Sequence, residues 1–158
     1  MMTWILFDRI NCRSVSAMGA CIGAVVGLVA ITPGCGFVSI PESIFIGFIS
    51  AIVSNLMVNW KALKKIDDTL DVFACHGVGG IMGMILTAIF AHGENASLLH
   101  GGIEVFAHHM MALILVSAFA FFGSLFLYKV TNRIITLRVS EESENDGLDL
   151  SQHGERLY

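Results

Sequence analysis

Four long apolar runs constrain this chain more than any other feature of its sequence. They cover about residues 16–33, 42–60, 72–91 and 104–129. A helix needs roughly 20 consecutive apolar residues to cross a hydrocarbon core of about 30 Å. The chain is also 55% hydrophobic and only 14% charged, which is more apolar material than a soluble domain of this length needs for its core. The runs therefore predict an all-α integral membrane protein with four transmembrane helices.

The last run extends beyond the length of a single crossing. From Glu104 to Leu137 the sequence contains no Pro and no Gly other than Gly123. One continuous helix of roughly 50 Å is therefore predicted at 1.5 Å per residue. A helix of this length has to tilt in the bilayer or protrude from it.

The basic residues alternate along the connections between the runs. The connections 34–41 and 92–102 contain no Lys or Arg. The other connections and the segment after the last run contain Arg9, Arg13, Lys61, Lys64, Lys65, Lys129, Arg133 and Arg138. Basic connections stay in the cytoplasm by the positive-inside rule. We therefore predict a multi-pass protein of the cell membrane, with membrane helices in residues 1–138 and a cytoplasmic C-terminal tail at 139–158.

Charge and cysteine usage disfavour several other classes of function. The net charge is −4, and five acidic residues lie between positions 141 and 149, so a nucleic-acid partner is not expected. The four cysteines stand singly, without a CxxC pair, and predict neither a metal site nor a disulfide framework. We expect no cofactor and no enzymatic activity.

Glycines recur at a spacing of four in two of the runs. The first run has Gly19, Gly23 and Gly27, and the third has Gly79 and Gly83. Small residues at this spacing let two helices approach to backbone contact, which matters in lipid because burial of apolar side chains gives little net driving force there. Both ridges are predicted to face neighbouring helices, and close packing is the simplest interpretation of them.

One histidine, His76, lies inside the third apolar run. An ionisable side chain in a membrane helix is a candidate functional group because it is costly to place unless it faces a cavity or a partner. A desolvated imidazole favours its neutral form, which donates and accepts one hydrogen bond each. A packing histidine bonded to a backbone carbonyl is the alternative. Asp71, at the start of this run, is predicted to cap the helix N-terminus.

Three segments together resemble the ammonium transporter (Amt/Mep/Rh) family. They read "GLVAITPGCGFV", "DDTLDVFACHGVGGIMG" and "DGLDLSQHGERLY" and cover residues 27–38, 67–83 and 146–158. The second and third are specific, because each combines uncommon residues at fixed spacing. The resemblance implies an eleven-helix protomer with two inverted five-helix repeats, assembled as a homotrimer with one narrow apolar pore per protomer. On this template the chain supplies the C-terminal portion, helices 8–11 and the cytoplasmic tail.

The resemblance also implies roles for individual residues. His76 matches the second of two pore histidines that share a hydrogen bond, Val72 an apolar pore-lining position, and Asp71 the acidic residue at the inner end of helix 10. The implied function is ammonium or ammonia transport for nitrogen uptake. The first repeat, with its own histidine and the aromatic residues of the outer gate, has no match here. A truncated, non-conducting subunit that associates with full-length transporter protomers is therefore the alternative.

The tail resembles the family segment on which PII signalling proteins dock at the cytoplasmic face. The resemblance carries this regulatory role to Gly147, Leu148, Asp149, His153, Gly154 and Tyr158. Gly147 permits a turn with positive φ. Leu148 is expected to anchor the tail, and Asp149 to cap a short helix. A disordered, solvated tail is the alternative.

Overall fold

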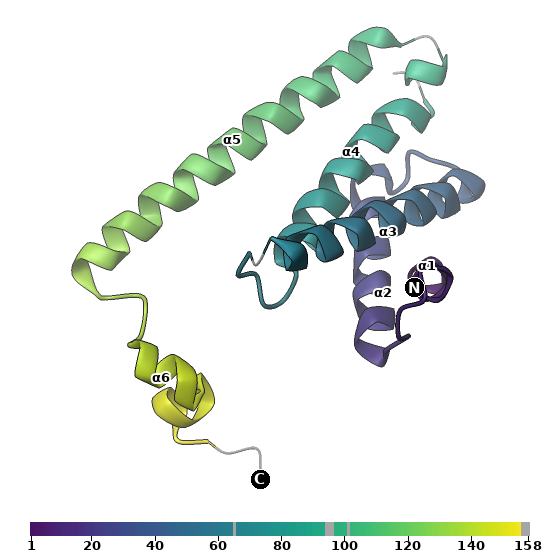
Figure 1. Ribbon diagram of the computed structural model, residues 1–158. Coiled ribbons are helices and arrows are strands. Elements are labelled where there is room, and N and C mark those ends of the chain that lie inside the picture. Colours follow the sequence, from purple (N-terminus) through teal and green to yellow (C-terminus); the bar gives the residue numbers. More distant parts are fainter. Residues whose placement is uncertain (65, 94–96, 101, 156–158) are drawn as a thin grey trace. The chain divides into compact units, whose positions relative to one another are not determined.

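The computed structural model describes residues 1–64, 66–93, 97–100 and 102–155, and every regular element within these ranges is helical (Figure 1). The chain divides into two compact units, Met1–Ile114 and Leu115–Tyr158. The helix α5 contributes its first residues to one unit and the rest to the other. The predicted all-α class is confirmed.

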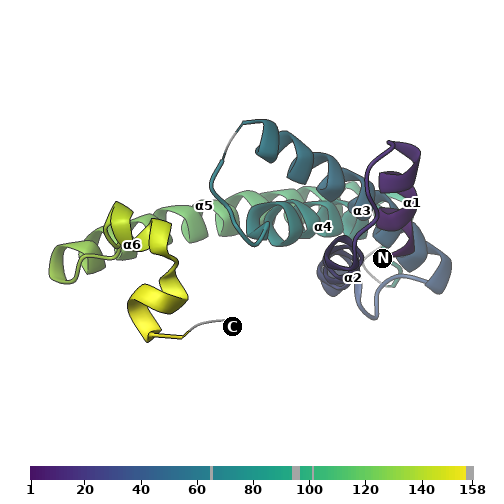
Figure 2. The same cartoon turned by 60° about the horizontal axis from the view of Figure 1, so that its bottom comes forward.

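The first unit is a bundle of helices. In chain order it contains α1 (Met2–Ile10), α2 (Ala17–Ile31), the 3₁₀ turn η1 (Thr32–Gly34), α3 (Ile40–Leu63), the π-helical turn η2 (Phe73–Val78), α4 (Gly79–Phe90), η3 (Leu98–His100) and the beginning of α5 (Ile103–Ile134). The helices α2, α3 and α4 all pack against one another, and α1 packs against α2 and α3 (Figures 1 and 2).

Among the described residues, four segments are long and apolar enough to cross a membrane, judged by length and composition. They are Ala17–Gly34, Ile40–Leu63, Phe73–Phe90 and Ile103–Ile134. Each lies within a few residues of a predicted apolar run. The last is one helix of 32 residues, about 48 Å at 1.5 Å per residue, as the absence of Pro from this segment predicts.

Local capping explains where two of these helices begin. The Ser16 hydroxyl accepts a hydrogen bond from Gly19 N–H (2.9 Å) at the start of α2. At the start of α3, Glu42 reaches back to the N–H of Ser39 (2.7 Å) in a capping box. Such caps satisfy N–H groups that have no partner inside the helix.

Glycines set the closest approaches within the bundle. A Cβ on Gly83 of α4 would lie 2.2 Å from the carbonyl oxygen of Ala30 in α2. A Cβ on Gly23 would lie 2.5 Å from Trp4 Cβ, so α1 rests on the small-residue face of α2. Two helices meet this closely only where a side chain is absent.

The other predicted packing glycines differ in how much they contribute. A Cβ on Gly19 would lie 3.2 Å from Trp4 Nε1, and one on Gly79 would make ordinary contact with Val29 at 3.6 Å. Gly27 has nothing within 4 Å of an added Cβ among the described residues. Within the described residues, the close packing predicted for the first run is therefore seen at Gly19 and Gly23 and not at Gly27.

The second unit contains the rest of α5 and two short helical segments, α6 (Glu141–Asp146) and η4 (Asp149–His153). The Ser140 hydroxyl caps α6 by accepting from Ser143 N–H (3.2 Å). Arg138 donates two hydrogen bonds to the Glu144 carboxylate, at 2.7 and 3.0 Å. These contacts give the tail local helical structure.

The predicted tail residues have different surroundings. Gly147 has φ +92° and Gly154 has φ +68°, both in the region that favours glycine. Leu148 is 50% exposed, so it is not buried in the described part of the chain. Asp149 and His153 begin and end η4, and no side-chain cap bond is formed at its N-terminus. The cap predicted for Asp149 is therefore not formed in the described part of the tail, whereas the preceding helix α6 is capped by Ser140. Tyr158 lies outside the described residues.

Candidate functional site

The π-helical turn η2 has one packed face and one open face. Ala74, Cys75 and Val78 are buried, and Cys75 packs in a cluster with Trp4 and Val26. Val72 and Phe73 are 51% and 56% exposed, and His76 is exposed as well. Residues three and four apart share one face of a helix. The sequence thus places an imidazole on an apolar face that points away from the core of the first unit.

The backbone around His76 differs from the continuous α-helix that the apolar run predicts. Residues Phe73–Val78 form a π-helix before α4 begins at Gly79. π-helical turns are rare and occur often at functional sites. A Cβ on Gly77 would lie 3.1 Å from the Phe73 ring, so glycine at this position lets that ring lie against the turn.

Within the described part of the chain, no hydrogen bond is found for the His76 imidazole. The packing interpretation requires a bond to a backbone carbonyl, and this unit supplies none. Among the described residues, neither ring nitrogen is engaged by another group of the chain.

Asp68 caps the turn. Its carboxylate oxygens accept hydrogen bonds from the N–H groups of Val72 (2.9 Å) and Phe73 (3.1 Å). Burial opposes ionisation of Asp68, but the two N–H donors and Lys61 outweigh it and lower the pKa of this carboxyl. The cap predicted for Asp71 therefore belongs to Asp68, three residues earlier.

Asp71 instead holds an unusual backbone conformation. Its φ is +54°, and residues other than Gly adopt this region at a cost of about 1–3 kcal/mol. Its carboxylate forms an ion pair with Lys61 (Nζ to Oδ1, 2.5 Å). Its carbonyl oxygen accepts from the N–H of Cys75 (2.8 Å). Asp71 thus turns the chain into η2.

A second polar cluster, not predicted from the sequence, links α1 to α3. Asn55 is 1% exposed; its amide donates to Asp8 (2.9 Å) and accepts from Arg13 (3.0 Å). Asn59 donates to Asn55 Oδ1 (3.0 Å). The only sequence signal for this cluster is the presence of uncharged polar residues at a spacing of four in an apolar run.

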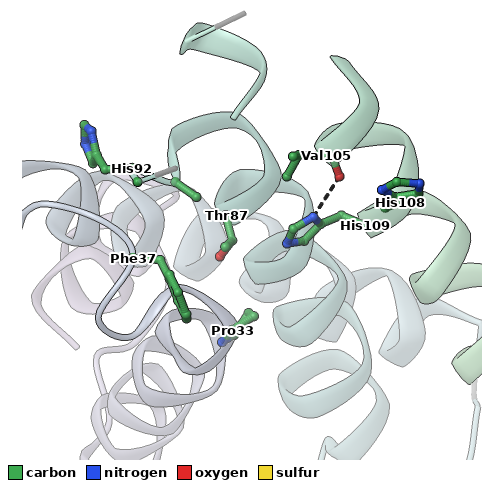
Figure 3. Close-up of a pocket in the computed structure, with 9 residues that line it drawn as sticks. Pro33, Phe37, Thr87, His92, Val105, His108 and His109 are labelled. Carbon is green, nitrogen blue, oxygen red and sulfur yellow. Dashed lines mark hydrogen bonds between the residues drawn. The ribbon is translucent and has the colours of Figure 1, made fainter. Parts of the chain in front are cut away.

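The opposite end of the bundle joins the two connections that lack basic residues. The N–H of His92 donates to the carbonyl oxygen of Phe37 (2.7 Å), and its ring nitrogen lies 2.8 Å from Glu42. A cavity of about 470 Å³ opens beside them. It is lined in part by Pro33, Phe37, Thr87, His108 and His109, as Figure 3 shows.

The basic connections and the connections without basic residues lie at opposite ends of the bundle, as the charge pattern predicts. Arg13 and Lys61 both contact residues at one end, while Phe37, Glu42 and His92 meet at the other. We call these the Lys61 end and the His92 end. Consecutive connections therefore lie at alternating ends of the α2–α3–α4 bundle.

Comparison with known proteins gives one consistent family. The sequence model described as "Ammonium Transporter Family" matches residues 1–158. Ammonium transporter Amt1 of Archaeoglobus fulgidus is 40% identical over 158 residues, covering 98% of this chain and 40% of that transporter. The ammonium transporter of Bacillus subtilis is 38% identical and covers the same shares. The chain thus spans about two fifths of the length of these curated relatives.

Solved structures show the same fold. The crystal structure of Saccharomyces cerevisiae Mep2 superposes with a TM-score of 0.82 at 31% identity, covering 89% of this chain and 34% of that protein. A structure described as "Sensor Amt Protein" superposes with a TM-score of 0.79 at 27% identity, covering 96% of this chain and 38% of that one.

Proposed function

The chain belongs to the Ammonium Transporter Family, and we propose that it forms the C-terminal part of a path for ammonium or ammonia across the cell membrane. The observation that carries this proposal is the open face of η2. There His76 lies beside Val72 in a segment apolar enough to span a membrane. The relatives are named as transporters, and the proposal assigns no catalytic step to the chain.

The chemistry of the permeant supports a role for a neutral imidazole at this place. Moving a bare cation into an apolar passage has a large desolvation cost. Ammonium that first loses its proton avoids this cost and crosses as neutral ammonia. Ammonia still needs hydrogen-bond partners, and His76 offers one donor and one acceptor. Val72 keeps the passage apolar next to it, so the charged form stays disfavoured.

A chimera tests this proposal directly. The part of Archaeoglobus fulgidus Amt1 that matches this chain is replaced by the chain, and uptake of labelled methylammonium is measured in cells without ammonium transporters. We expect uptake by the chimera and its loss in His76→Ala. A hydrogen bond between neutral groups lowers the barrier by about 0.5–1.5 kcal/mol, so uptake should fall by up to roughly tenfold.

The matched control is His108→Ala, which removes another exposed imidazole, on α5. It should leave uptake unchanged at equal surface expression. A correctly assembled chimera with no uptake would favour the alternative of a non-conducting subunit. Wild-type uptake by the His76→Ala chimera would instead remove His76 from the path.

A carboxylate at position 76 tests the electrostatic part of the mechanism. In His76→Glu a fixed negative charge would stabilise a cation inside the passage. We expect such a chimera to carry a potassium current that the parent chimera lacks. Uptake without any such current would mean that side-chain charge at this position does not select between ammonia and its cation.

We also propose that the Lys61 end faces the cytoplasm, since it contains the basic connections. Single cysteines at positions 37 and 64 of a cysteine-free chimera test this orientation. An impermeant thiol reagent added outside should label position 37 and spare position 64. The reverse pattern would invert the proposed topology.

For the tail we propose a regulatory surface at the cytoplasmic face of a homotrimer, with a PII signalling protein as its partner. The conformation of Gly147, φ +92°, supports a tail of defined shape, and the likeness to a "Sensor Amt Protein" accords with a signalling role. Gly147→Asp places a side chain where the backbone favours glycine. It should alter uptake or its response to nitrogen supply, whereas an unchanged response would leave the tail without a regulatory role.

A further inference from the structure

Lys61 contacts several oxygen atoms of the segment that precedes η2. It belongs to the last turn of α3 and is only 7% exposed. Its ammonium donates to the carbonyl oxygen of Asp68 and lies 3.4 Å from Asp68 Oδ2 and 2.5 Å from Asp71 Oδ1. A lysine has three N–H donors, and here three oxygens from one short segment surround them.

The contacts continue from this segment into the turn that contains His76. Asp68 accepts from the first N–H groups of the turn, those of Val72 and Phe73. Asp71 accepts from Cys75 N–H through its carbonyl oxygen. Both acids therefore contact the Lys61 ammonium as well as the backbone of the turn, Asp68 through its carboxylate and Asp71 through its carboxylate and its carbonyl oxygen. The position of the first turn, and hence of His76, is fixed through them.

We propose that Lys61 is a positioning residue for His76. It acts through Asp68 and Asp71, without touching the permeant, by holding the π-helical turn in the register that puts the imidazole on the open face. This inference rests on the proposed function, because transport is what the position of His76 would serve. Asp71 at φ +54° is the point in this chain of contacts that needs an external restraint most.

The test uses the whole chain in lipid nanodiscs, with Lys61→Met as the main variant. Methionine keeps an unbranched stem of similar length and removes the ammonium. We expect the Val72 and Phe73 amides to exchange with solvent roughly tenfold faster, as loss of a helix cap would produce. The imidazole nitrogen resonances of His76, assigned by their loss in His76→Ala, should shift as well.

Two further variants separate positioning from a general effect of charge. Lys64→Met removes an exposed lysine at the end of the same helix and should change neither amide exchange nor the His76 resonances. Lys61→Arg restores a cation that can donate to the same oxygens and should recover the His76 resonances at least in part. In the chimera, uptake should fall in Lys61→Met, recover in Lys61→Arg and stay unchanged in Lys64→Met.

Unshifted His76 resonances in a folded Lys61→Met chain would overturn the proposal. If that variant does not fold, Asp68→Asn decides, since it weakens the same connection with a side chain of equal size; His76 resonances unchanged in Asp68→Asn would also overturn it. A parent chimera without uptake would refute the proposed transport function alone. The resonance and exchange measurements would still decide whether Lys61 positions the turn.

Discussion

The two ends of the α2–α3–α4 bundle are closed by different kinds of polar contact. At the Lys61 end, polar side chains are buried: Asn55 is 1% exposed and Lys61 7%, and each has partners on another segment. At the His92 end the side chains of His92 and Glu42 are 46% and 21% exposed. Their hydrogen-bonded contact lies beside an open cavity.

This difference shows how the burial of a polar group decides which contacts it requires. A buried polar or charged group without a partner is expensive, so the Lys61 end uses networks in which one group satisfies several others. A pair that is partly exposed to water gains little from its attraction, because water screens it. We therefore expect substitutions at the Lys61 end to have the larger effects on stability.

The two ends keep their contacts only while the helices between them stay packed. The substitution Gly83→Ala tests this packing and should have the largest effect on stability. In Gly83→Ala the new methyl would lie 2.2 Å from Ala30 O, a backbone atom that cannot move away alone. We expect a loss of about 3 kcal/mol or more in the free energy of unfolding, seen as a lower midpoint of thermal unfolding in detergent.

Gly27→Ala is the matched control, since the methyl it adds to α2 meets no described residue within 4 Å. It should be neutral or stabilise by up to about 1 kcal/mol, because alanine favours the helix more than glycine does. Equal destabilisation by both variants would show that helix propensity, and not the contact with Ala30, governs this pair.

The comparison between the ends is tested directly by removing one partner at each. Asn55→Ala leaves the buried Asp8 without its 2.9 Å donor and should cost about 1–3 kcal/mol. His92→Ala removes only the exposed side chain, since the backbone bond to Phe37 remains, and should cost under about 1 kcal/mol. Unfolding of the two variants under one set of conditions gives the order. A larger loss for His92→Ala would reverse the comparison.

The smallest expected effect concerns the exposed pair in the second unit. The two hydrogen bonds from Arg138 lower the pKa of Glu144 below its usual 4.5. Stability from this pair is therefore complete above that usual pKa and is lost as the pH falls through the lower, folded value. Helical chemical shifts of residues 141–153 should persist above the usual carboxyl pKa of 4.5 and weaken as the pH falls through the lowered pKa of Glu144. In Glu144→Gln they should not depend on this titration.

The sequence by itself determined the class of protein and the order of its membrane helices. Apolar runs of about 20 residues define helices because the bilayer leaves the backbone no partner outside the helix. The alternation of basic connections predicted which connections meet, as His92 and Phe37 do. The segment from Asp67 to Gly83 indicated the family, since its uncommon residues stand at fixed spacing.

Only the tertiary structure decided how the polar residues are paired. Lys61 contributed to the topology as one positive charge, but its three oxygen partners come from a connection that folds back on α3. Two other differences from the sequence prediction also depend on tertiary packing. The cap is formed by Asp68 and not by Asp71, and Gly27 makes no close contact in the described part of the chain. Each depends on the angle at which a neighbouring segment packs, and local residue spacing does not determine that angle. The first residues of the π-helical turn at His76 are likewise held by contacts with Asp68 and Asp71.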